Sequence, residues 1–112
     1  MSQITTHILD TSIGKPAAGV AVTLQQKIND GWQVLSAGIT DNDGRIMELL
    51  DKDKVLEAGV YRLRFETKPY FNQRNIQSFY PRVIVEFEIT NTTHYHVPLL
   101  LNPFGYSTYR GS

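Results

Sequence analysis

Cysteine is absent from this 112-residue chain, which excludes disulfides and a thiolate nucleophile. No apolar run approaches the roughly 18–20 residues that a membrane-spanning helix needs. Eleven basic and eleven acidic residues give a formal net charge of zero, so the chain has no electrostatic footprint for nucleic acid or an anionic membrane. The first residues lack the basic and apolar regions of a signal peptide, and the last ones are not a peroxisomal address. We therefore expect a cytoplasmic protein that binds neither nucleic acid nor membrane.

The hydrophobic residues, 41% of the chain, alternate with polar ones along most of the sequence. A period of two is typical of strands that bury one face, and turn signals such as Asn29-Asp30-Gly31 separate the segments. The pattern predicts loops at 10–19 and 51–58, a short helix at 70–75, and strands at 4–10, 20–24, 32–40, 45–50, 61–67, 82–89, 93–101 and 106–110. Short strands at this spacing predict an all-β fold, a β-sandwich, in a single domain over residues 1–112.

Two of the three histidines, His94 and His96, lie two residues apart on a predicted strand and so point to the same face. The opposite face is apolar, which predicts that it points toward the core. It carries Tyr95, Val97, Leu99 and Leu101. His96 therefore points away from the core, next to Pro98 and Leu100. An outer face that combines apolar groups with an imidazole indicates a surface covered by another subunit. His94 is nearer the start of the strand, and we expect it to be exposed to solvent.

The third histidine, His7, shares a face of the first strand with Thr5 and Leu9, and Ser107 shares a face of the last strand with Tyr109. Histidine is the side chain whose ordinary pKa lies nearest neutrality, which suits acid–base chemistry. Two alternatives use the same residues. His7, His94 and His96 are a possible metal site, but no cysteine or suitably spaced carboxylate accompanies them, so we predict no metal. A serine nucleophile, Ser107 or Ser112, lacks the sharp turn that exposes such a residue.

The last four residues, Tyr109-Arg110-Gly111-Ser112, combine a phenol, a guanidinium and a hydroxyl directly after a strongly apolar strand. The segment from His94 to Ser112 resembles the C-terminal signature of the transthyretin-related proteins that act as 5-hydroxyisourate hydrolases. The Tyr-Arg-Gly-Ser end separates these hydrolases from the hormone carrier transthyretin. Further similar motifs follow in the expected order: Thr5–Asp10, Gly14–Ala17 and Thr40–Arg45. Asn102 departs from the serine that is more common in the family, in a turn that both residues favour.

The resemblance implies a transthyretin-like sandwich of two four-stranded sheets with one short helix. It also implies a homotetramer in which two dimers pack face to face around a channel. The substrate would be 5-hydroxyisourate, opened by water to 2-oxo-4-hydroxy-4-carboxy-5-ureidoimidazoline in urate degradation, with no cofactor. The implied catalytic residues are His7, Arg45, His96 and Ser112. The implied substrate-binding residues are His7, Arg45, Tyr109, Arg110 and Gly111.

The resemblance leaves two functions open. In the first, the two histidines supply the general base and the general acid, and Arg45 stabilises the oxyanion. The hydroxyl or terminal carboxylate of Ser112 would orient water or a histidine. In the second, the chain is a transthyretin-like module that binds a small ligand without turning it over. His7, Arg45, His96 and the Tyr-Arg-Gly-Ser end favour the hydrolase, because a carrier does not require them.

Overall fold

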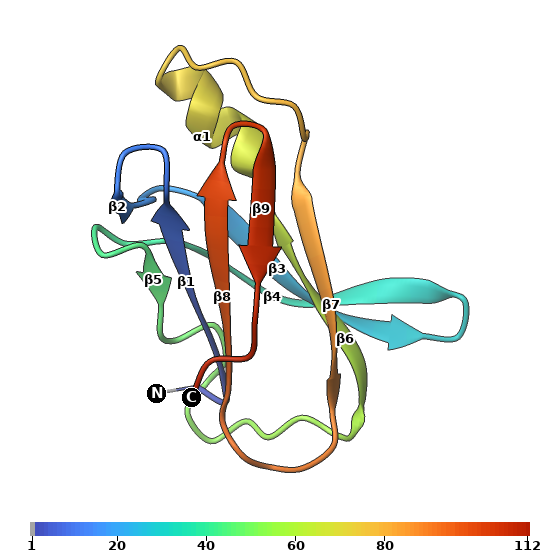
Figure 1. Cartoon of the computed structure of the whole chain (residues 1–112). Coiled ribbons are helices and arrows are strands. Elements are labelled where there is room, and N and C mark those ends of the chain that lie inside the picture. Colours follow the sequence, from blue (N-terminus) through green and yellow to red (C-terminus); the bar gives the residue numbers. More distant parts are fainter. Residues whose placement is uncertain (1) are drawn as a thin grey trace.

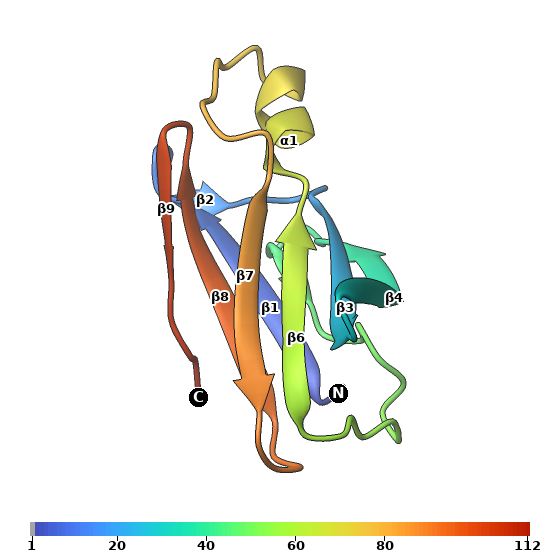
Figure 2. The same cartoon turned by 90° about the vertical axis from the view of Figure 1, so that its right-hand side faces the viewer.

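Two β-sheets pack against each other in the computed structural model, which describes residues 2–112 (Figures 1 and 2). The first sheet has the order β2-β1-β8-β9, and β5 pairs with β1 beside β2. Its strands are β1 (Ile4–Asp10), β2 (Lys15–Pro16), β5 (Arg45–Ile46), β8 (Tyr95–Asn102) and β9 (Gly105–Thr108). The second sheet has the order β4-β3-β6-β7. Its strands are β3 (Ala21–Ile28), β4 (Gly31–Ile39), β6 (Gly59–Phe65) and β7 (Val83–Ile89).

The all-β sandwich is confirmed, and the helix within the described residues is α1 (Thr67–Gln73). The first sheet has five strands rather than four, because both β2 and β5 pair with β1. The predicted strand at 45–50 is reduced to the two residues of β5. The chain turns inward after it, and Leu49 and Leu50 are buried in the core. The predicted domain begins at residue 1, which lies outside the described residues.

The helix α1 begins three residues earlier than the start predicted at residue 70. Pro69 is tolerated in its first turn, because the backbone N–H groups there have no partner within a helix. The helix packs Tyr70 and Phe71 into the interior and covers one end of the sandwich, as Figure 2 shows. It ends before Asn75, whose φ of 57° is left-handed. No helix within residues 2–112 is long and apolar enough to cross a membrane.

The core lies between the two sheets and takes one face of each strand, as the period of two predicts. Leu24 and Leu63 from the second sheet and Ile8 and Leu99 from the first are fully buried. Each side chain of this size contributes about 1.5–3 kcal/mol when it is fully removed from water. The outer faces of the sheets are therefore free for other uses.

The strands β1 and β8 pair in parallel at the centre of the first sheet, although about ninety residues separate them (Figure 1). The register sets Thr5 beside His96, His7 beside Pro98 and Leu9 beside Leu100. Paired residues on neighbouring strands share a face. This register therefore brings the predicted outer faces of β1 and β8 together as one surface.

Candidate active site

The outer face of the first sheet carries three of the predicted catalytic side chains. His96 comes from β8, His7 from β1, and Arg45 from β5, whose register sets Arg45 directly beside His7. Three segments that are distant in the sequence thus contribute an imidazole, a second imidazole and a guanidinium to one surface. The face predicted for His7 and His96 from the alternation of residues is the face on which the structure places them.

Arg45 is positioned by the tight turn that precedes it. Asp41 closes this turn, because its carboxylate Oδ1 accepts hydrogen bonds from the backbone N–H groups of Asp43 and Arg45. Gly44 adopts a φ of 73°, and a Cβ at this position would lie 2.5 Å from the carbonyl oxygen of Ile8. The turn therefore requires glycine. The carbonyl of Gly44 accepts a hydrogen bond of 2.8 Å from the N–H of Ile8, which fixes the turn to β1.

The hydroxyl of Thr5 holds the ring of His96 from β1. Thr5 Oγ1 lies 2.7 Å from Nδ1 of His96 and 2.8 Å from Nε2 of His94. Thr5 is fully buried, whereas His94 is exposed as predicted. The planes of the two imidazole rings are inclined by 27°, with their centroids 6.2 Å apart. Because Thr5 occupies Nδ1, Nε2 is the nitrogen of His96 that is left for a substrate.

The C-terminal segment crosses directly over His96. The backbone N–H of Gly111 donates a hydrogen bond of 2.8 Å to the carbonyl of His96. A Cβ on Gly111 would lie 2.5 Å from Cδ2 of the His96 ring, a separation that real Cβ atoms do not reach. Only glycine allows the tail to approach this closely. The ring of His96 is thus held by Thr5 on one edge and by Gly111 on another.

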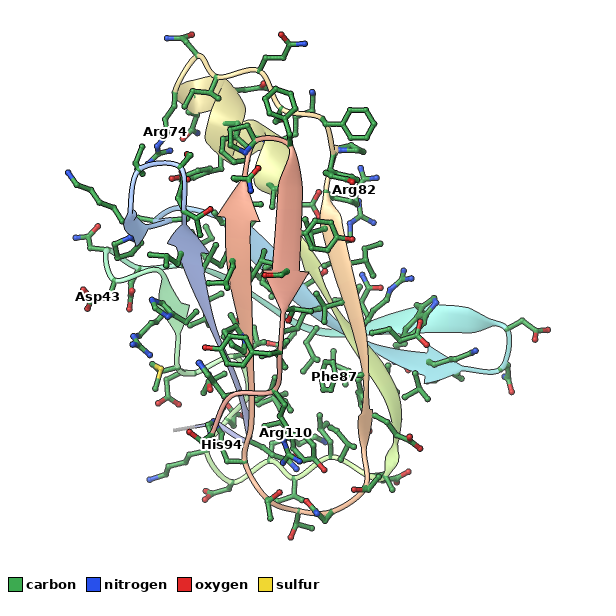
Figure 3. The ribbon with its side chains drawn as sticks, viewed as in Figure 1. Asp43, Arg74, Arg82, Phe87, His94 and Arg110 are labelled. Carbon is green, nitrogen blue, oxygen red and sulfur yellow. The ribbon has the colours of Figure 1, made fainter. Side chains whose placement is uncertain are left out.

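The electrostatics of the surface favour neutral imidazoles. Burial is the largest effect that lowers the pKa of His96 below its ordinary value of 6.5, and His94, Arg45 and His7 lower it further. Burial also lowers the pKa of His7 below 6.5, and Arg45 adds to the effect, while Asp41 and Asp43 act in the opposite direction. Figure 3 shows Asp43 on the turn before β5. Both rings are therefore unprotonated at neutral pH and able to accept a proton.

The remaining tail residues do not all join this surface. Tyr109 and Ser112 are exposed, and β9 ends at Thr108, before the predicted end at residue 110. The guanidinium of Arg110 stacks on the ring of Tyr95, 4.3 Å from its centroid, on the side of β8 opposite to His96. Arg110 there lines a pocket of about 280 Å³, together with Phe87 of β7 (Figure 3). Within this chain, the structure does not bring Arg110 to the two histidines.

The predicted histidines do not form a set of metal ligands. Within residues 2–112, no group of three or more His, Cys, Asp or Glu side chains lies close enough to hold a metal ion. Instead, His94 and His96 share the hydroxyl of Thr5. Thr5 is the site residue that the sequence analysis missed. Its place on the face of His7 was a signal, but the hydrogen bonds depend on the pairing of β1 with β8.

The fold and this surface together define a class, a two-sheet sandwich with acid–base groups on the outer face of one sheet. A family model described as the HIUase/Transthyretin family matches residues 4–111, and the chain belongs to this family. The 5-hydroxyisourate hydrolase of Salmonella typhimurium is 51% identical over 110 residues, which are 97% of this chain and 80% of that protein. The family predicted from the sequence is thereby confirmed.

Solved structures of both kinds of family member resemble this fold. The 5-hydroxyisourate hydrolase of Klebsiella pneumoniae is 39% identical with a TM-score of 0.86, over 97% of this chain and 98% of that one. Sea bream transthyretin in complex with thyroxine is 36% identical with a TM-score of 0.90, over 97% and 94% of the two chains. The backbone thus resembles the hydrolase and the thyroxine-bound transthyretin alike, and the side chains of the site must distinguish them.

Proposed function

We propose that this protein is a hydrolase that opens 5-hydroxyisourate to 2-oxo-4-hydroxy-4-carboxy-5-ureidoimidazoline in urate degradation. The observation that carries the proposal is the meeting of His7, Arg45 and His96 on one face of the first sheet. Two unprotonated imidazoles beside a permanent cation suit hydrolysis of a cyclic amide at neutral pH. The curated relatives with this activity support the substrate.

In the proposed reaction, one imidazole takes a proton from water as the water oxygen bonds to a ring carbonyl carbon. The carbonyl oxygen becomes an oxyanion, which the Arg45 guanidinium stabilises. The C–N bond then breaks, and the departing ring nitrogen receives a proton from the second imidazole, which regains one from the imidazolium formed on the first, so both rings end neutral. Water is thus divided between the new carboxyl group and the released nitrogen. Positioned proton transfer of this kind contributes about 10²–10⁴-fold to a rate.

The tail is proposed to complete the site. Gly111 fixes the ring of His96. Tyr109, two residues before Gly111, and Ser112, directly after it, have exposed side chains that are free to contact a substrate. The predicted binding role of Arg110 requires a substrate, or a residue of a second copy, to approach from the side of Tyr95. No cofactor takes part in the proposed reaction.

The direct test is whether the purified protein accelerates the decay of freshly generated 5-hydroxyisourate, followed by ultraviolet absorbance. We expect rapid, saturable turnover that dialysis against a chelator leaves unchanged. Binding of the compound without faster decay would contradict the hydrolase and favour the ligand-binding module. The TM-score of 0.90 with thyroxine-bound transthyretin is the observation that keeps this second function under test.

We further propose that the protein is a homotetramer and that a second copy closes the site. His7, Arg45 and His96 lie on the face of a sheet, which by itself leaves a substrate open to water. The sequence predicts that another subunit covers the apolar side chains of this face. Part of that cover comes from the chain itself, because Pro98 is buried and Leu100 is half-buried within it. Light scattering at micromolar concentration tests the assembly, and a monomer would overturn it. The predicted cytoplasmic location stays a prediction.

A further inference from the structure

The buried hydroxyl of Thr5 lies between two imidazoles and cannot donate its one proton to both of them. A hydroxyl has one proton to donate and lone pairs to accept with. Its oxygen is within hydrogen-bond distance of Nδ1 of His96 and of Nε2 of His94. If Thr5 accepts from His96, it is free to donate to His94. If it donates to His96, it must accept from His94.

The two arrangements give His96 opposite chemistry. When Nδ1 of His96 donates to Thr5, the neutral ring carries its proton there, and Nε2 is bare and able to accept one. When Thr5 donates to Nδ1 instead, the neutral ring carries its proton on Nε2, which then serves only as an acid. The direction of one hydrogen bond therefore decides whether His96 is a base or an acid toward the substrate.

The electrostatics of His96 favour the first arrangement. Burial, His94, Arg45 and His7 all lower the pKa of His96, and a hydrogen bond with the backbone of Thr5 acts against them. A backbone group that stabilises the protonated ring is a carbonyl, because both nitrogens of that ring carry an N–H and need an acceptor. Thr5 lies against the Nδ1 edge of His96, and an N–H on that edge suits an acceptor there.

We propose that Thr5 holds the proton of His96 on Nδ1 by accepting a hydrogen bond from it, while the Thr5 hydroxyl donates a hydrogen bond to His94. Nε2 of His96 is then the general base. Thr5 and His94 are then positioning residues that act through His96. This inference rests on the proposed function, which leaves open which histidine is the base. Gly111 supports the arrangement, because the tail over the ring prevents it from turning away from Thr5.

The first experiment reads the proton position directly. Ring ¹⁵N shifts of the histidines, recorded near neutral pH without substrate, should show His96 of the wild type protonated at Nδ1. Thr5→Val removes the hydroxyl with little change of shape and should give a mixture of the two neutral forms, whereas Thr5→Ser should keep the wild-type pattern. The matched control is Thr6→Val, which removes an equally buried hydroxyl that bonds the carbonyl of Val97 on the opposite face of β1.

The second experiment measures the consequence for turnover. Thr5→Val should lower kcat at least about tenfold, since the wrong histidine tautomer costs about 10⁴-fold in a serine protease. KM should change little, and Thr5→Ser and Thr6→Val should keep most of the rate. His94→Leu, at an exposed position, should show the same mixed tautomer with a smaller loss of kcat than Thr5→Val.

Three outcomes would overturn the proposal: wild-type His96 protonated at Nε2, an unchanged tautomer in Thr5→Val, or a changed tautomer with full kcat. Failure of the proposed function is distinct from these. It would appear as a wild-type protein that does not accelerate substrate decay, and the ¹⁵N measurement gives its answer in either case. Thr5→Ser and His94→Leu keep the test decisive if Thr5→Val does not fold.

Discussion

The outer faces of the two sheets differ in whether their arginine side chains have partners. On the second sheet, Arg62 donates a 2.7 Å hydrogen bond to Gln25 and stacks on Trp32, while Arg64 and Glu66 form an ion pair at 2.7 Å. On the first sheet, the side chain of Arg45 has no ion pair or hydrogen bond within residues 2–112. A face that neutralises its own charges is complete, whereas a free guanidinium beside two imidazoles is available to a ligand.

The largest effect should come from removing either imidazole. His96→Asn and His7→Ala should each lower kcat by about 10²-fold or more, because positioned proton transfer contributes about 10²–10⁴-fold. Circular dichroism should show an intact β-fold, since both side chains lie outside the core. Near wild-type kcat in both variants would show that the outer face of the first sheet is not the catalytic surface.

A smaller loss is expected from one methyl group on the tail. Gly111→Ala places a Cβ 2.5 Å from the ring of His96, so the ring or the tail must move. A misplacement of about 1 Å costs about 10²-fold in rate, and we expect a kcat loss approaching that size. Gly105→Ala is the control, because its Cβ would meet nothing closer than 3.7 Å. Equal rates in the two variants would show that the position of the tail does not matter for turnover.

The next effect concerns the pKa values of His7 and His96, which an arginine on the first sheet should change and one on the second sheet should not. Arg45→Gln removes a positive charge that lowers the pKa of both His7 and His96, so both values should rise toward 6.5. In the wild type, the loss of activity on acidification should therefore occur below pH 6.5, and in Arg45→Gln it should occur at a higher pH. Titration of the imidazole C–H signals by NMR measures the shift. Unchanged values would show that Arg45 does not act on the histidines.

The smallest effect is expected on the second sheet. Arg64→Gln removes one partner of a surface ion pair, which contributes about 0.2–1 kcal/mol to the free energy of unfolding. Thermal melting should show a small decrease in Tm, with kcat unchanged and with no shift in the pKa of His7 or His96. A marked loss of activity would mean that the second face takes part in function, contrary to the contrast drawn above.

The alternation of residues predicted the face of each histidine, because the period of a strand is a local property. The family motif treats the last four residues as one unit of the site, but the structure places Arg110 over Tyr95, away from the two histidines. Neither source revealed the role of Thr5. Its contacts depend on the register between two strands about ninety residues apart, which no local pattern encodes.

The parallel pairing of β1 with β8 also sets when the site can form. Thr5 and His96 are separated by 91 positions, so their contact waits until nearly all of the described chain has left the ribosome. At a synthesis rate of about 5–20 residues per second, the first strand spends several seconds without its central neighbour. Pairings this distant also make folding slow, on the order of milliseconds to seconds. The acid–base surface is thus a late product of folding, and a chain arrested before β8 has all of β1 but no site.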